Sequence, residues 1–297
     1  MPIALPASAA QIFTSRLPIG ARESRTSAKG NTPAAVYRKL VARLRRKPQV
    51  GHFAAPFGLA TDVRGNLYVT NFESNSIAIV NPRYHVRDNV ITQGVESPVS
   101  VAVGPLGNVY VGNLTQSSGY VTEYSGSTPL LTIEAYTGDP DSIAVDSFGD
   151  LYVTASSGIA TDDPYGSPLF GPAYASYNVL SVAVGNAGLN GFYNNGALIG
   201  NGSVFLRTGS LQFGIGPTSS ATPTGSACAN NACWYDDTSN LLIAKEQNGG
   251  TYLVSVSYEP TGVAYDGLRN RLFVADPNHN AIHVYNAQTL AFETTIS

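Results

Sequence analysis

The residues best suited to chemistry are oxygen donors that flank short β-branched runs of the chain. Glutamate or aspartate stands just before three of these runs, and an asparagine ends one of them. Carboxylate and amide oxygens are the ligands that hard cations prefer. We therefore predict a site for Ca²⁺ or another divalent cation, with the alternative of ordinary solvated surface residues. The four predicted ligands are Glu96, Asn113, Asp139 and Glu259.

The two cysteines, Cys228 and Cys233, stand close together in a turn-rich stretch. Their C-x4-C spacing allows a small disulfide loop if the compartment is oxidising. A zinc site needs about four ligands, and no histidine lies near this pair. We predict a disulfide, with free thiols as the alternative.

Histidines and nucleophile motifs give little sign of catalysis. The chain has 4 histidines, too few and too scattered to predict a three-histidine zinc site. His279, in Asp-Pro-Asn-His-Asn, is interpreted as an ordinary loop residue. No G-x-S-x-G, P-loop or H-E-x-x-H motif is present.

A repeated unit must position these residues. Its clearest copy, residues 56–82, reads as a short strand, a turn at Arg64-Gly65-Asn66, a strand at 67–70, a polar loop and a strand at 77–80. Gly65 can take the positive φ of a tight turn, and the β-branched and aromatic residues that follow favour a strand.

The unit recurs from Pro98, Pro140 and Pro260, and the first two steps are equal at 42 residues. Weaker copies begin near residues 180 and 223, so the sequence predicts six units. A period of about 40 to 45 residues with four strands per unit is typical of a β-propeller. We predict an all-β, six-bladed β-propeller over residues 51–297; the alternative is a β-sandwich.

The unit resembles the NHL repeat. The positions that match are Gly51, Phe53, Pro56, Gly58, Leu59, Ala60, Asp62, Gly65, Asn66, Leu67, Tyr68, Val69 and Asn71. Residues 260–286 match nearly as well, and residues 155–250 match weakly. The resemblance implies a propeller but no single function, because NHL-like propellers include RNA- and protein-binding modules, lyases, lactonase-like hydrolases and secreted proteins without known activity.

Two site predictions rest on this resemblance. Lactonase-like propellers gather Glu, Asn and Asp around a metal at the channel mouth, which implies that role for the four predicted ligands. His52 resembles the position at which an amidating lyase of this kind places a zinc-binding histidine, but the other repeats lack a matching one.

The two parts of the chain carry opposite net charges. Residues 1–50 hold ten Lys and Arg and one acid, whereas the remainder is acidic. Residues 33–47 predict a basic amphipathic helix, begun by Thr32 and Pro33 and stopped by Pro48. It would dock on the acidic propeller of its own or a neighbouring chain, with an anionic membrane or nucleic acid as alternatives. Its binding residues would be Arg38, Arg43, Arg45 and Arg46.

A Gly-, Pro- and Tyr-rich stretch, 155–177, interrupts the third unit and is interpreted as a long binding loop. Tyr165, Tyr174 and Tyr177 would stack on a sugar or a protein.

The sequence thus favours a non-catalytic binding or structural propeller that engages a protein, a glycan or its own copies. The alternative is a metal-dependent hydrolase or lyase with its site at the channel mouth. The acidic body argues against nucleic acid. Charged residues are only 12 %, which is common in exported proteins, so an extracellular or cell-envelope location is expected. No apolar run is long enough for a membrane span.

Overall fold

The structure is a computed structural model that describes most of the chain after residue 51. The described residues are 52–115, 119–134, 139–155, 158–166, 168–173, 179–185, 188–193, 212–215, 223–229, 232–247 and 250–297. The basic helix predicted at 33–47 and its four arginines lie outside them. The described part of the chain contains no helix that is long and apolar enough to cross a bilayer.

Every described element is a strand, and the strands pair into sheets of consecutive members. Five sheets have four strands and one has three. Their bounds are β1 Pro56–Thr61, β2 Leu67–Asn71, β3 Ser76–Val80 and β4 Val86–Ile91; β5 Pro98–Val103, β6 Val109–Asn113, β7 Tyr120–Ser125 and β8 Thr128–Glu134; β9 Ser142–Val145, β10 Leu151–Ala155, β11 Gly158–Asp162 and β12 Pro168–Ala173; β13 Val179–Gly185, β14 Gly188–Tyr193 and β15 Gln212–Ile215; β16 Ser226–Ala229, β17 Ala232–Asp237, β18 Leu242–Gln247 and β19 Gly250–Ser255; β20 Val263–Asp266, β21 Arg271–Asp276, β22 Ala281–Asn286 and β23 Phe292–Ile296.

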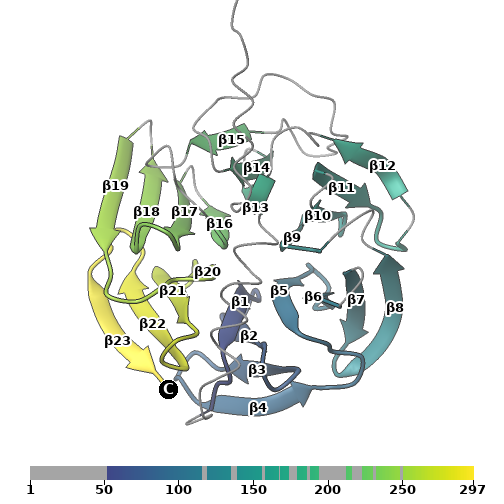
Figure 1. The fold of residues 1–297 in the computed structure, drawn as a ribbon, viewed down its shortest axis with the longest axis horizontal. Helices are drawn as coiled ribbons and strands as arrows, with labels where there is room; N and C mark the ends of the chain where they lie inside the picture. Colours follow the sequence, from purple (N-terminus) through teal and green to yellow (C-terminus); the bar gives the residue numbers. More distant parts are fainter. Residues whose placement is uncertain are drawn as a thin grey trace, which may run out of the picture.

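The sheets are arranged radially, with the first strand of each at the centre (Figure 1). These inner strands β1, β5, β9, β13, β16 and β20 are neighbours in that order, and β20 returns to β1. The all-β propeller is therefore confirmed. The prediction of six blades is wrong: among the described residues there are five four-stranded blades, and β13–β15 is a smaller sheet in which β15 runs parallel to β14.

The turn between β1 and β2 shows why the repeat folds this way. The Asp62 carboxylate accepts hydrogen bonds from the backbone N–H groups of Arg64 and Asn66 at 2.9 and 2.8 Å. Gly65 supplies the positive φ of 82° that the turn requires. Asp146 repeats these bonds in the β9–β10 turn, so side-chain caps fix the strand register in both of these units.

The inner strands approach one another too closely for ordinary side chains. A Cβ added to Gly58 of β1 would lie 2.7 Å from the backbone of Ser100 on β5. The other inner strands have small residues in the same place, and their hydroxyl groups bond across the ring: Ser181 Oγ lies 3.4 Å from Ser142 Oγ and 2.6 Å from Ser226 Oγ. Small residues near the start of each inner strand therefore allow the ring to close at its centre.

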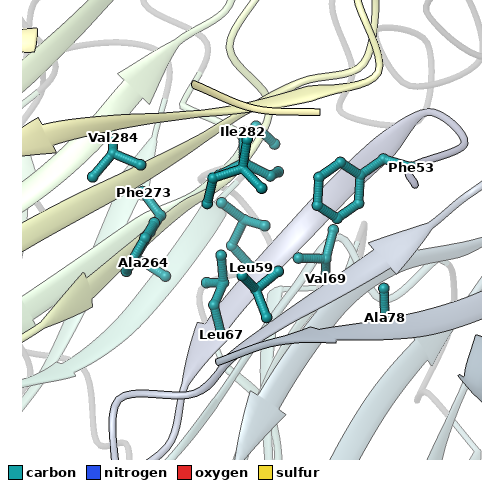
Figure 2. Packing of buried hydrophobic residues seen from close by; sticks show 12 residues of the cluster. Phe53, Leu59, Leu67, Val69, Ala78, Ala264, Phe273, Ile282 and Val284 are labelled. Atoms are coloured by element: carbon teal, nitrogen blue, oxygen red, sulfur yellow. The ribbon is translucent and has the colours of Figure 1, made fainter. Parts of the chain in front are cut away.

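Blades β1–β4 and β20–β23 close the ring without a shared strand among the described residues. Their facing sheets pack Leu59, Leu67 and Val69 against Phe273 and Ile282 (Figure 2). Residues 52 and 53, ahead of β1, are not in a strand.

The β1–β4 and β20–β23 blades are also joined by a recurring hydrogen bond. Asn280 Oδ1 accepts from Ala55 N at 2.9 Å, as Asn75 Oδ1 accepts from Ser97 N at 2.8 Å between the first two blades. The junction between the last and the first blade thus uses the same asparagine-to-backbone hydrogen bond as the junction between the first two blades.

Two local predictions are corrected. The long loop expected at 155–177 contains strands β11 and β12, joined by a turn that begins at Asp163. Their Gly- and Pro-rich composition hid them, because strand formation there follows from pairing with β10. The second strand of the weak unit after 223 is β17, not the run at 241–244, which belongs to the third strand β18. Cys228 and Cys233 face each other across the β16–β17 hairpin and form a disulfide.

We expect Gly58→Ala to destabilise the protein by about 1–3 kcal/mol, because the added methyl group overlaps the β5 backbone. Gly250→Ala is the matched control, since its Cβ would meet nothing closer than 3.5 Å. Urea unfolding of both variants measures the difference. Equal free energies of unfolding would contradict the close-approach argument.

Candidate active site at the channel mouth

One face of the propeller collects the loops that come before each first strand and after each second strand. The inner strands run in the same direction, because Thr261 Oγ1 bonds Pro56 O beside the start of β1, while Thr61 Oγ1 bonds Tyr265 O near its end. We call the face at the starts of the inner strands the mouth face, and the opposite one the turn face.

The four predicted cation ligands all stand on the mouth face, and two of them have structural partners there. Asn113 Oδ1 accepts from Glu96 N at 2.9 Å, and its Nδ2 donates to Val111 O at 3.1 Å. Glu259 Oε2 accepts from Asn278 Nδ2 at 3.1 Å. The amide of Asn113 therefore holds the start of its own blade.

A metal centre needs several ligands around one point. Across the described parts of the chain, no group of three or more His, Cys, Asp or Glu side chains is arranged so that it could hold a metal ion. Glu96, Asp139 and Glu259 therefore form no such cluster with one another. A cation role for them stays a prediction.

The structure instead gathers a carboxylate and two histidines at the end of β21. Asp276 Oδ2 lies 2.6 Å from His279 Nδ1 and 3.1 Å from His283 Nε2. Asp276 Oδ1 accepts from the backbone N–H groups of Asn278 and His279 at 3.1 and 3.2 Å. Asp276 occupies the slot filled in other blades by Asn71 and Asn113, whose side chains bond their own preceding segments.

Burial separates the roles of the three side chains. Asp276 is 1 % exposed and His283 17 %, whereas the ring of His279 is 65 % exposed. A carboxylate can only accept, so His279 Nδ1 carries the proton toward it, and in the neutral ring Nε2 is left as an acceptor. A buried carboxylate that orients an exposed imidazole is the arrangement of a general base.

Aromatic and hydroxyl groups hold the inner histidine. The ring of His283 stacks on Tyr258 with centroids 4.2 Å apart, and His283 Nδ1 lies 3.0 Å from Thr295 Oγ1. The hydroxyl groups of Tyr258 and Tyr285 are 2.8 Å apart. Burial, and then the hydrogen bond with Tyr285, raises the pKa of Tyr258 far above its usual range, so this support stays uncharged.

The loop that carries His279 is fixed at both sides. Asn278 bonds Glu259 at the start of its own blade, and Asn280 bonds Ala55 at the start of the β1–β4 blade. The imidazole therefore projects at a blade junction on the mouth face, from a loop whose neighbours are tied down.

Two buried carboxyl groups near the inner ring have raised pKa values. Burial, and then the charge of Asp139, raises the pKa of Asp141 well above its usual range. Burial raises the pKa of Asp236 to about 8, although hydrogen bonds from Thr224 and Gly225 act in the opposite direction. Both are buried, so neither faces a substrate, and Asp236 holds the start of its blade through the backbone N–H groups of Thr224 and Gly225.

The other predicted binding residues do not meet this cluster. Tyr165 lies in the β11–β12 turn, which is on the turn face. Tyr174, Tyr177, Arg38, Arg43, Arg45 and Arg46 lie outside the described residues. Lys245 and Glu246, expected at the mouth, lie instead toward the turn-face end of β18.

Sequence reasoning noted Asp276 and His279 but read the histidine as an ordinary loop residue, and it missed His283 and Tyr258. A signal was present: the strand-exit slot that holds Asn in two other repeats holds Asp here, followed by histidines three and seven residues later. That spacing places both histidines near one carboxylate only after the β21–β22 hairpin folds back.

Comparisons with known proteins show the fold. No protein family pattern matches the chain, and no curated protein does. A streptogramin B lyase is similar over 84% of this chain and 85% of its own, with 14% identity and a TM-score of 0.60. A gluconolactonase from Xanthomonas campestris has 13% identity and a TM-score of 0.58, over 76% of this chain and 85% of its own.

Another similar structure is a lyase in which one histidine has been replaced. It is a catalytically inactive histidine-to-alanine variant of virginiamycin B lyase from Staphylococcus aureus, with quinupristin; the similarity covers 83% of this chain and 86% of that one, with 14% identity and a TM-score of 0.58. These structures confirm the resemblance to a propeller repeat family.

The sequence favoured a non-catalytic binding or structural module, and that prediction is wrong. These three similar propellers are a lyase, an inactive variant of a lyase and a gluconolactonase, none of which is a non-catalytic module in its native form. No contiguous catalytic motif is present in the sequence, and the two histidines meet Asp276 only through a loop and a hairpin.

The pH dependence of stability tests the raised pKa of the buried Asp236 carboxyl group. Its pKa is about 8 in the folded protein and about 4 in the unfolded chain, so the native state holds the extra proton between these values. Stability should therefore fall as pH rises from about 4 to 8, by at most about 1.4 kcal/mol per pH unit from this group.

Asp236→Asn keeps the Oδ1 acceptor for Thr224 N and Gly225 N and cannot ionise. We expect its unfolding free energy to decline less than that of the wild type between pH 5 and pH 8. Denaturant unfolding at both values measures this, and identical pH dependence in the two proteins would contradict it.

Proposed function

We propose that this protein is an enzyme of the lyase or lactone-hydrolase type, with the Asp276–His279 pair as its general base at the channel mouth. The observation that carries the proposal is the exposed imidazole of His279, whose Nδ1 lies 2.6 Å from the buried Asp276 carboxylate. In either reaction His279 Nε2 takes a proton, from a carbon acid in an elimination or from water in a hydrolysis.

The comparisons support this choice at the level of enzyme class. Similar propellers carry out lyase and lactonase reactions, and in one of them replacing a histidine by alanine removes activity. At these identities the substrate does not transfer to this chain.

Metal dependence is not part of the proposal. The donor set needed for a divalent cation is not gathered among the described residues, so no step is assigned to a metal. The described groups supply base catalysis by His279, with Asp276 fixing its tautomer and Glu259 and Asn278 shaping the adjacent rim.

We also propose that the enzyme works in an oxidising compartment, as an extracellular or cell-envelope protein. The Cys228–Cys233 disulfide supports this location, because disulfides persist mainly outside reducing cytosol.

The experiment is turnover of a panel of lactones and streptogramin antibiotics, followed by mass spectrometry. A hydrolysis product gains the mass of one water, whereas the products of an elimination together gain none. His279→Ala should lower kcat by about 100- to 10,000-fold, the usual contribution of a general base. Asp276→Asn should lower it by about tenfold or more, because it removes the acceptor that orients the ring.

His85→Ala is the matched control, since this exposed histidine lies in the β3–β4 turn on the opposite face. Its turnover should equal that of the wild type. Full activity of folded His279→Ala would overturn the assignment of the base. Loss of activity on chelation alone would show that a metal centre, rather than this pair, carries the reaction.

A further inference from the structure

The turn face carries exposed apolar side chains that the fold does not use. Four inner hairpin turns each present one: Val63 is 79 % exposed, Leu106 90 %, Phe148 51 % and Leu268 68 %. Tyr165, at the tip of the β11–β12 turn, is also strongly exposed on this face. Single exposed apolar residues are common, but the same placement on four hairpins of one face is not a scattered pattern.

The turns do not need these side chains to form. Asp62, Asp146 and Asp266 cap the backbone of their turns through their carboxylates. Gly65 and Gly149 provide the positive φ values of 82° and 88°. The apolar tips therefore project from a preordered scaffold and gain nothing from folding.

Basic residues gather on the same face. The chain has 17 Lys and Arg, of which only seven lie beyond residue 50. Five of these seven occupy the turn-face ends of two neighbouring blades, β1–β4 and β20–β23: Arg64, Arg83, Arg87, Arg269 and Arg271.

Three of the five arginines carry charge that no ion pair among the described residues compensates, whereas the other two are paired with acids. Asp266 is buried and paired with Arg269 at 3.0 Å, and the Asp62 carboxylate accepts hydrogen bonds from its own turn. Arg271 pairs with Glu293 at 3.5 Å, whereas Arg64, Arg83 and Arg87 are exposed. The β1–β4 and β20–β23 blades thus present arginine beside Val63 and Leu268.

We propose that the turn face docks on an anionic lipid bilayer. Apolar tips beside exposed arginines fit the boundary between acyl chains and negatively charged headgroups. Docked in this way, the mouth face with His279 points into water.

The test is co-sedimentation of the full chain with vesicles of phosphatidylglycerol and phosphatidylcholine, and with phosphatidylcholine alone. The wild type should bind the mixed vesicles and lose binding in high salt. The double variant Leu106→Ser and Leu268→Ser should bind about tenfold or more weakly, because it removes two inserting side chains. Arg64→Gln should weaken binding about fivefold, and adding Arg83→Gln should weaken it again.

Leu253→Ser is the matched control, since Leu253 is 50 % exposed on the outer strand β19, away from the turn tips. Its binding should stay within about twofold of the wild type, and circular dichroism should show that all variants are folded. Absence of wild-type binding, or unchanged binding of the Leu106 and Leu268 variant, would overturn the proposal. Equal binding to uncharged vesicles would overturn the role of the arginines.

Discussion

The central constraint of this protein is the close approach of its inner strands. Gly58 meets the β5 backbone, Ser100 Oγ donates to Pro140 O at 3.0 Å, and Ser181 bonds Ser226, so each inner strand needs a small residue at one place. Larger side chains there would force the blades apart. Because the ring is tight, the starts of the first strands and the exits of the second strands converge on one face, and the hairpin turns converge on the other.

The candidate active site follows from a departure at one repeat position. Asn71 and Asn113 use their amides to hold the start of their own blades, which is a structural task. In the last blade the corresponding residue is Asp276, and its carboxylate holds two imidazoles instead. A change from amide to carboxylate converts a structural bond into an acceptor that can orient a base. The remaining repeats supply the rigid frame around it.

The two faces of the ring then differ in chemistry. The mouth face has carboxylates, amides and the Asp276–His279 pair beside the loop bond of Asn280 to Ala55. The turn face has capped hairpins with apolar tips, and most of the arginines that follow residue 50. Both arrangements depend on the same alternation of loops and turns, which the repeat imposes on every blade.

The sequence by itself determined the strands of the strong repeats, because Gly, Asn and Asp at turns and β-branched runs between them act locally. Residues 56–113 and 260–296 folded as their pattern predicts. Only the tertiary structure decided that β11 and β12 are strands, that one sheet has three strands among the described residues, and that β17 precedes β18. These features depend on pairing with neighbouring strands rather than on propensity. It also decided the candidate site: His279 and His283 meet one buried carboxylate because a loop and a hairpin return them to it, and no linear pattern encodes the distances that make a histidine a base.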